Sequence, residues 1–146
     1  MPYKKPVSVL VVIHTSGHEI LLLERAAHPG YWQSVTGSQE GDESLAETAA
    51  REVLEETGID IAALGLCLAD WQQTNIYEIF PEWRHRYAPG ITENTEHVFS
   101  LEVPRNIAIR IAPDEHLAHD WLPMLAAAEK VFSWSNREAI LQLNKR

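Results

Sequence analysis

The stretch GSQEGDESLAETAAREVLEETGI, residues 37–59, determines how the rest of the chain is interpreted. Ser44 followed three residues later by Glu47 forms a capping box, which predicts the start of a helix. Alanine-rich sequence continues the helix to Thr57, and Gly58 suits the left-handed position that ends many helices. The stretch therefore predicts a glycine-bearing loop, a helix and a second loop.

Three glutamates lie near the predicted C-terminal end of this helix, where the helix dipole disfavours negative charge. At 3.6 residues per turn, Glu52, Glu55 and Glu56 fall within an arc of about 100°. Glu52 and Glu56 form a like-charge i,i+4 pair that costs about 0.2–0.5 kcal/mol. A solvated acidic face with Arg51 as a local partner would explain two such residues. Three of them beside a glycine loop favour a site for Mg²⁺ or Mn²⁺, which prefer carboxylate oxygens.

The same stretch satisfies the pattern G-x5-E-x7-R-E-U-x-E-E-x-G-U, in which U is aliphatic. The constrained positions are Gly37, Glu43, Arg51, Glu52, Val53, Glu55, Glu56, Gly58 and Ile59. This stretch resembles the Nudix box. The resemblance implies an α/β/α sandwich with a mixed sheet and a loop–helix–loop motif, and Mg²⁺-dependent hydrolysis of a diphosphate, with Mn²⁺ as a possible substitute.

The resemblance also implies roles for individual residues. It matches Glu52, Glu55 and Glu56 to metal-binding positions. Arg51 and Glu43 match positions that orient the loop and the metal ligands, and Gly37 matches a glycine that lets the backbone approach the site. Either Glu56 or Glu55 could act as the general base, which must reach the attacking water.

Strand and helix patterns along the chain predict an α+β fold formed by a single domain of residues 1–146. The predicted strands cover residues 7–14, 20–25, 32–36 and 95–104, with further strands within 59–73, 75–90 and 105–123. Pro123 is predicted in the first turn of a second helix. Residues 133–146 are predicted to close the chain as a helix.

The bulk composition excludes several classes of protein. A formal net charge of -9 argues against a nucleic-acid partner, which requires a basic surface. No segment reaches transmembrane length, and the apolar run of residues 7–13 is too short for a signal peptide. The only cysteine, Cys67, excludes an internal disulfide and is expected to be buried. We expect a cytoplasmic monomer without a membrane partner.

Sequence outside the box indicates the substrate. The stretches KKPVSVLVVI, YWQSVTGS, EIFPEWRHRYAPG, TENTEH and SWSNREAI occur in this order. Together they resemble the bacterial dihydroneopterin triphosphate pyrophosphohydrolases of folate biosynthesis, a branch of the Nudix family. The resemblance implies hydrolysis of the α–β anhydride of this pterin triphosphate, which releases pyrophosphate.

Two other functions stay open at this point. A nucleotide-pool enzyme that acts on dATP or oxidised dGTP would use the same box, so the small-molecule partner is a pterin or a nucleoside triphosphate. A binding module that had lost catalysis would typically lack box carboxylates, and all of them are present here.

Candidate residues outside the box have an alternative interpretation in each case. Glu115 resembles a metal-associated acid of this family and is a second candidate base, with a solvent-exposed turn acid as the alternative. The resemblance favours Lys4 and Arg25 as phosphate ligands, with exposed flanking charges as the alternative. The basic run of residues 84–86 either binds phosphates or balances nearby surface acids.

A flat pterin requires an aromatic or apolar slot with a few polar contacts. The resemblance places Tyr77, Glu78, Ile79 and Phe80 at this slot, although core packing would also explain Tyr77 and Phe80. Thr36 and Ser133 are expected to add hydroxyl contacts. His116 and His119 lie three residues apart in an irregular acidic segment, which argues against a zinc site.

Overall fold

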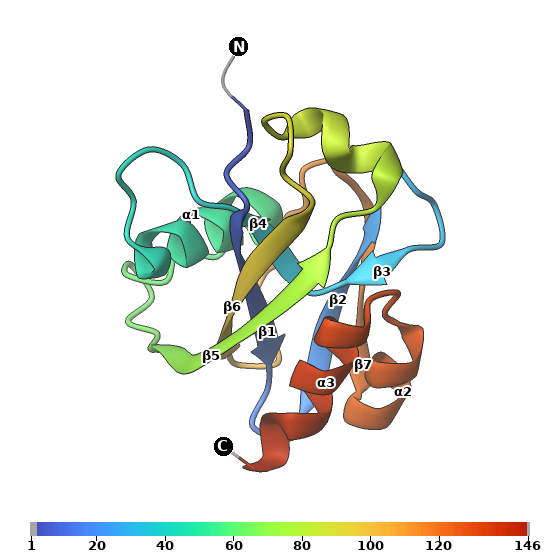
Figure 1. Cartoon of the computed structure of the whole chain (residues 1–146). Helices are drawn as coiled ribbons and strands as arrows, with labels where there is room; N and C mark the ends of the chain where they lie inside the picture. The colour runs from blue at the N-terminus through green and yellow to red at the C-terminus, as the bar shows by residue number, and fades with distance from the viewer. Residues whose placement is uncertain (1–2, 146) are drawn as a thin grey trace.

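Strand β1 (Val7–His14) runs through the centre of the computed structural model, which describes residues 3–145 (Figure 1). All of β1 except its first residue is buried, as expected for a run rich in β-branched side chains. β1 pairs in parallel with β6 (Glu93–Glu102) and antiparallel with β4 (Val35–Ser38). The sheet is therefore mixed, as the sequence predicts.

The remaining strands extend the sheet on both sides of β1. The order is β3-β2-β1-β6-β5, with β7 paired to β2 and β4 paired to β1. The outer strands are β2 (Glu19–Arg25), β3 (Trp32–Gln33), β5 (Leu68–Glu78) and β7 (His116–Pro123).

The sheet divides beyond the turn that joins β1 to β2. These two strands share only the Cα pair His14↔Ile20. Further along, β1 pairs with β4 whereas β2 pairs with β7 and β3. The two halves of the sheet therefore diverge, and the divergence leaves room for a cleft between them.

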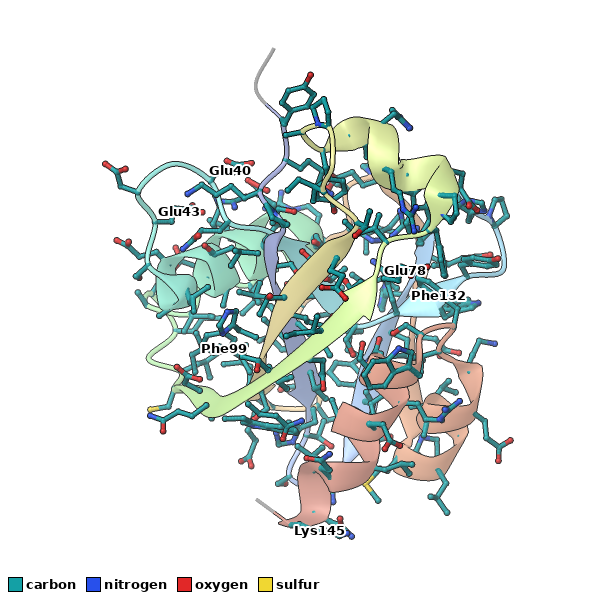
Figure 2. The ribbon with its side chains drawn as sticks, viewed as in Figure 1. Glu40, Glu43, Glu78, Phe99, Phe132 and Lys145 are labelled. Atoms are coloured by element: carbon teal, nitrogen blue, oxygen red, sulfur yellow. The ribbon has the colours of Figure 1, made fainter. Side chains whose placement is uncertain are left out.

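Helices cover both faces of the sheet and complete the predicted α/β/α sandwich (Figure 1). α1 (Leu45–Thr57) packs Ala49 and Val53 into a core cluster that includes Val9 and Phe99. Figure 2 labels Phe99 within this interior. On the other face, α2 (Met124–Lys130) and α3 (Trp134–Gln142) pack on a second cluster that includes Leu10. Two short 3₁₀ segments, η1 (Pro81–Arg86) and η2 (Leu143–Lys145), complete the described elements.

The predicted capping of α1 is confirmed at both ends. The Ser44 hydroxyl accepts a hydrogen bond from the Glu47 N–H at 3.1 Å, and the Glu47 carboxylate accepts one from the Ser44 N–H at 2.8 Å. Gly58 has φ 77° and donates its N–H to the Leu54 carbonyl at 2.9 Å. The positive φ explains why a glycine ends this helix.

The segment after β6 corrects one prediction. Residues 105–111 form no strand, although they alternate apolar and polar side chains. Ile107, Ile109 and Ile111 pack against the core cluster beside α1 without a strand partner. The Arg110 N–H instead donates to the Thr57 carbonyl at 2.8 Å, which satisfies one backbone group at the end of α1.

Three further expectations were wrong. Residues 81–86 form the 3₁₀ segment η1 and not strand or open loop. Pro123 is the last residue of β7 and precedes the first turn of α2. Cys67 is exposed, because it lies just before an edge strand and not in the core.

Within residues 3–145, no helix is both long and apolar enough to span a membrane.

Candidate active site

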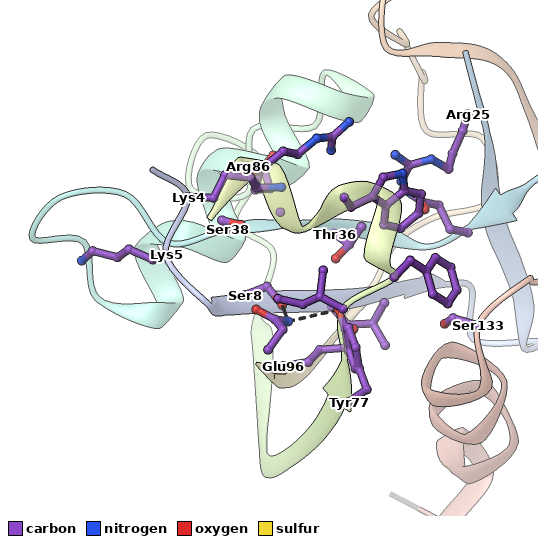
Figure 3. A pocket seen from close by; sticks show the side chains of 18 of the residues that line it. Lys4, Lys5, Ser8, Arg25, Thr36, Ser38, Tyr77, Arg86, Glu96 and Ser133 are labelled. Atoms are coloured by element: carbon purple, nitrogen blue, oxygen red, sulfur yellow. Dashed lines mark hydrogen bonds between the residues drawn. The ribbon is translucent and has the colours of Figure 1, made fainter. Parts of the chain in front are cut away.

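A cleft of about 1150 Å³ lies where the two halves of the sheet diverge. Its walls come from β1, β4, β6, α1, η1 and the start of α3, and Figure 3 shows many of the lining side chains. The structure brings most of the predicted site residues to this one cleft. They are Lys4, Arg25, Thr36, Gly37, Glu52, Glu56, Tyr77, Glu78, Ile79, Phe80, Glu115 and Ser133.

Two carboxylates of α1 form the acidic wall of the cleft. Glu56 is 4% exposed, and burial, the Glu52 charge and a hydrogen bond to Glu52 raise its pKa well above the ordinary value. Burial also raises the pKa of Glu52. The Thr36 N–H donates to Glu56, but Glu56 Oε1 is buried without a hydrogen-bond partner.

The backbone of β4 lies directly against this pair. A Cβ added to Gly37 would lie 1.8 Å from Glu52 Oε2 and 2.0 Å from the carboxyl carbon. Any larger residue would therefore displace the whole Glu52 carboxylate. The glycine of the box is required here by close approach and not by backbone conformation.

His116, at the start of β7, faces Glu56 from the opposite half of the sheet. Its Nε2 lies 3.7 Å from Glu56 Oε1, and both side chains are about 6% exposed. Burial and the nearby Arg25 lower the pKa of His116, so the neutral imidazole is favoured. No local sequence pattern predicts this contact, because it joins residues that are distant in the chain.

Arg51 joins the loop before α1 to the helix. Its Nε donates to Glu43 Oε2 at 2.5 Å, and its Nη2 donates to Glu43 Oε1 and to the Ser38 carbonyl, both at 3.0 Å. Nη1 reaches Glu52 Oε2 and Glu55 Oε1, both at 3.2 Å. Hydrogen bonds from Arg51 lower the pKa of Glu43 to about 2. Arg51 does not line the cleft and positions residues that do.

The donor set suits a hard divalent cation. Carboxylate oxygens are the ligands that such cations prefer, and a cation would relieve the repulsion between Glu52 and Glu56 and provide a partner for Glu56 Oε1. Glu115 lines the cleft close enough to raise the pKa of Glu56, whereas the Glu55 side chain is 51% exposed and outside it. Within residues 3–145, no three acidic, imidazole or thiol side chains are already arranged to hold a metal ion.

Cationic side chains lie on another wall of the cleft. Lys4, Arg25 and Arg86 all line it, and burial followed by the charge of Arg86 lowers the pKa values of Lys4 and Arg25. The Lys4 N–H donates to the Arg86 carbonyl at 2.9 Å. Trp83 lies beneath Arg25 and Arg86, with ring distances of 5.1 and 5.9 Å. Mutually repelling cations in one cleft are suited to phosphate oxygens.

The structure separates the three residues of the basic run. Arg86 lines the cleft. Arg84 instead forms an ion pair with Glu78 at 3.2 Å and donates to the Ile79 carbonyl at 2.9 Å. Neither Arg84 nor His85 is among the residues that line the cleft.

Aromatic side chains surround the mouth of the cleft. Phe80 is 46% exposed, which excludes the core-packing interpretation for this residue, and its ring lies 5.0 Å from that of Trp83. Phe132, labelled in Figure 2, stacks on Tyr31 at 4.8 Å. The Thr36 hydroxyl donates to the Val9 carbonyl, and the Ser133 hydroxyl accepts from the Asn136 N–H that it caps. Both hydroxyls keep part of their hydrogen-bonding capacity.

A polar floor, formed by Ser8, Tyr77, Asn94 and Glu96, lies on the face of the sheet that α3 covers. Figure 3 shows Ser8, Tyr77 and Glu96 to one side of Thr36, with Lys4 and Arg86 on the other. The Asn94 amide donates to Ser8 Oγ at 2.8 Å and to the Tyr77 hydroxyl at 3.0 Å. Our sequence interpretation missed Asn94 and Glu96. The signal was polar residues at inward positions of β6, where apolar ones are expected.

The fold and the carboxylate cleft define the class of this protein. The NUDIX domain model matches residues 4–143, and the chain therefore belongs to the Nudix family. The match covers the elements that build both halves of the sheet.

Two similar proteins and one solved structure share one described activity. The chain is 50% identical to the dihydroneopterin triphosphate diphosphatase of Escherichia coli K12, over 96% of this chain and 93% of that protein. It is 42% identical to the protein of the same name from Haemophilus influenzae, over 96% and 88%. The solved structure of the E. coli dihydroneopterin triphosphate pyrophosphohydrolase superposes with a TM-score of 0.91, at 50% identity and 97% coverage of both chains.

Proposed function

We propose that this chain hydrolyses dihydroneopterin triphosphate to dihydroneopterin monophosphate and pyrophosphate in folate biosynthesis. One observation supports hydrolysis of a triphosphate: the carboxylates Glu52 and Glu56 line the same cleft as the cations Lys4 and Arg25. The choice of substrate rests on 50% identity over 96% of the chain to a diphosphatase of that specificity.

The carboxylates of the cleft are the proposed ligands of a divalent cation. Nudix enzymes typically depend on a divalent metal, and we propose that Glu52 and Glu56 hold Mg²⁺, or Mn²⁺ in its place, with Glu55 and Glu115 as further ligands. When bound, the cation supplies charge neutralisation at the phosphates and activation of water. Arg51 keeps Glu52 in place through its hydrogen bond and keeps the preceding loop in place through Glu43.

The cationic wall binds the triphosphate. Lys4, Arg25 and Arg86 all line the cleft. Among residues 3–145 none of the three forms an ion pair, so phosphate oxygens would provide their anionic partners. A base must accept the proton of the attacking water. Glu56, with its raised pKa, Glu55 and Glu115 are the candidates. The pterin would be enclosed by side chains that line the cleft, namely Thr36, Tyr77, Glu78, Ile79, Phe80 and Ser133.

The first experiment measures pyrophosphate and orthophosphate release with Mg²⁺. Dihydroneopterin triphosphate, dATP and 8-oxo-dGTP are compared at matched low concentrations. We expect pyrophosphate as the product and the highest kcat/KM on the pterin. A higher kcat/KM on either nucleotide would instead assign the chain to nucleotide-pool hydrolysis. Orthophosphate as the main product would contradict cleavage of the α–β anhydride.

Other expectations are untested by this experiment. The single domain of residues 1–146, the monomeric state and the cytoplasmic location stay predictions from the sequence. Size-exclusion chromatography with light scattering would test the monomeric state directly.

A further inference from the structure

Glu96 is a buried carboxylate that the hydrolytic chemistry does not use. It is 4% exposed and lines the cleft from β6, on the face of the sheet opposite α1. Among residues 3–145 no Lys, Arg or His side chain forms an ion pair with it. A buried acid without a cation carries a desolvation cost, so its presence in a cleft requires an explanation.

The partners of Glu96 satisfy only part of its hydrogen-bonding capacity. Asn75 Nδ2 donates to Oε1 at 3.4 Å, and the Ser135 hydroxyl donates a second hydrogen bond. A carboxylate has about four acceptor sites, so capacity remains for a ligand. Burial raises the pKa of Glu96, and these two hydrogen bonds oppose that shift.

Neighbouring groups form a fixed polar floor around this carboxylate. Asn94 is 2% exposed, and its amide nitrogen is held by Ser8 and Tyr77. Its carbonyl oxygen is buried without a partner. The floor therefore presents acceptors more than donors, which suits a ligand edge rich in N–H groups.

A pterin has such an edge. Its 2-amino group and the adjacent ring N3–H are two parallel donors, and a carboxylate accepts both in a bidentate pair. Adenine presents one amino donor beside a ring nitrogen that accepts, so an ionised carboxylate matches only half of that edge. The pterin and dATP therefore differ at this point, whereas 8-oxo-dGTP carries an amino group beside a ring N–H as the pterin does.

We infer that Glu96 is a specificity-determining residue that accepts hydrogen bonds from the amino and ring N–H donors of the pterin. This inference rests on the proposed function and adds to it one specific contact, between the Glu96 carboxylate and the pterin ring. Glu96 binds the base and takes no part in cleavage of the anhydride. A purely structural Glu96, which only joins β5 to α3, would affect every substrate equally.

The test compares Glu96→Gln with the wild-type enzyme on dihydroneopterin triphosphate and dATP. Glutamine keeps the size but replaces one acceptor oxygen with an NH₂ donor. We expect kcat/KM on the pterin to fall about 10–100-fold, mainly through KM, the scale for loss of one bidentate contact. On dATP we expect a change below about threefold, or a rise, because an amide matches the adenine edge.

A matched control lies on the same strand. Glu102→Gln changes an exposed glutamate at the other end of β6 and should leave kcat/KM on both substrates unchanged. Thermal melting of both variants verifies folding. Equal losses on pterin and dATP in Glu96→Gln, or no loss on the pterin, would overturn the inference.

A second measurement needs no variant. The wild-type enzyme is assayed with the pterin triphosphate in which oxygen replaces the 2-amino group. We expect its kcat/KM to fall about 10–100-fold, because a donor has become an acceptor that faces the carboxylate. Equal rates on the two pterins would contradict the inference while leaving the proposed function intact. Absence of pyrophosphate release from both pterins would instead contradict the proposed function.

Discussion

Glu43 and Glu56 belong to one loop–helix segment, but their surroundings shift their pKa values in opposite directions. Glu43 accepts hydrogen bonds from Arg51, the Glu40 N–H and the Thr48 hydroxyl, and its pKa is about 2. Glu56 is buried beside Glu52, one of its oxygens has no partner, and its pKa is raised well above the ordinary value. The first carboxylate stabilises the fold, whereas burial of the second without a partner for Oε1 carries an energetic cost.

Because of proton linkage, the contributions of the two residues to folding stability change with pH in opposite directions. A depressed pKa such as that of Glu43 contributes stability that is present above the unfolded pKa and is lost as pH falls through the folded pKa. A raised acid pKa such as that of Glu56 means that folding favours the protonated form. Its contribution therefore becomes unfavourable as pH rises from the unfolded value through the folded one.

Glu56→Gln tests whether the buried carboxylate serves activity at a cost in stability. We expect kcat to fall by roughly a thousandfold or more, because a transition-state charge contact is lost. The melting temperature should stay equal or rise, because the variant removes an unfavourable buried charge. Steady-state kinetics and thermal melting measure both quantities on the same preparation.

An exposed glutamate of α2 provides the control. Glu129→Gln removes the same charge outside the cleft and should change neither quantity. Strong unfolding of Glu56→Gln with normal turnover of the remaining folded protein would contradict the assignment of Glu56.

Compared with Glu56→Gln, Glu43→Gln should reduce stability more and activity less. Loss of charged hydrogen bonds to Arg51 is expected to destabilise the fold by about 1.5–3 kcal/mol. Activity should fall about 10–100-fold, because Arg51 no longer holds Glu52 and the loop correctly. Urea unfolding and kcat/KM measure these effects.

The neighbouring Glu40 offers a matched comparison for this loop. Its side chain is 72% exposed and lies 3.8 Å from Arg51, so Glu40→Gln should change stability by less than about 0.5 kcal/mol. Equal destabilisation by the two variants would show that charge in the loop, and not the Glu43 contacts, provides the stability.

The stability contribution of Glu43 should also disappear in acid. The difference in unfolding free energy between wild type and Glu43→Gln should be complete above pH 4.5, the ordinary value, and decline as pH falls toward about 2. Urea unfolding between pH 6 and 3 would reveal the start of this decline. A difference that is constant across this range would mean that the lowered pKa does not underlie the stabilisation.

Added Mg²⁺ should stabilise the folded protein through the carboxylate wall. At a concentration about 100 times Kd, linkage predicts about 2.7 kcal/mol, which raises Tm by several degrees. In Glu56→Gln the rise should be much smaller. Differential scanning calorimetry with and without EDTA measures the shift, and equal shifts in both proteins would place the metal elsewhere.

The N-terminal end of α1, where side chains accept hydrogen bonds from the backbone, contributes a smaller amount of stability. Ser44→Ala removes the hydrogen bond to the Glu47 N–H and should cost about 1 kcal/mol. Because Ser44 does not line the cleft, kcat/KM at low temperature should be unchanged. A large loss of activity without loss of stability would show that the two ends of α1 are not independent.

Local interactions explain what the sequence predicted well. The caps of α1, the strand β1 and the carboxylate cluster depend on residues that are close in the chain. The box pattern also placed Gly37 correctly, because its spacing reflects the close approach to Glu52.

Contacts between distant residues explain what was missed. Ile107 and Ile109 alternate like a strand, but alternation does not reveal whether a partner strand is present. His116 meets Glu56 only after β7 pairs with β2. Glu96 lines the cleft because the α3 face of the sheet forms part of its wall, an arrangement that depends on contacts between distant residues.

The placement of the α1 carboxylates and of the polar floor on opposite faces of the sheet has an evolutionary consequence. Glu52 and Glu56 come from α1, whereas the polar floor belongs largely to β5 and β6. Substitutions in the floor can therefore change which base is accepted while the machinery that cleaves the anhydride is inherited unaltered. Such a modular arrangement would let gene duplication produce enzymes with new substrates through a few changes on one pair of strands.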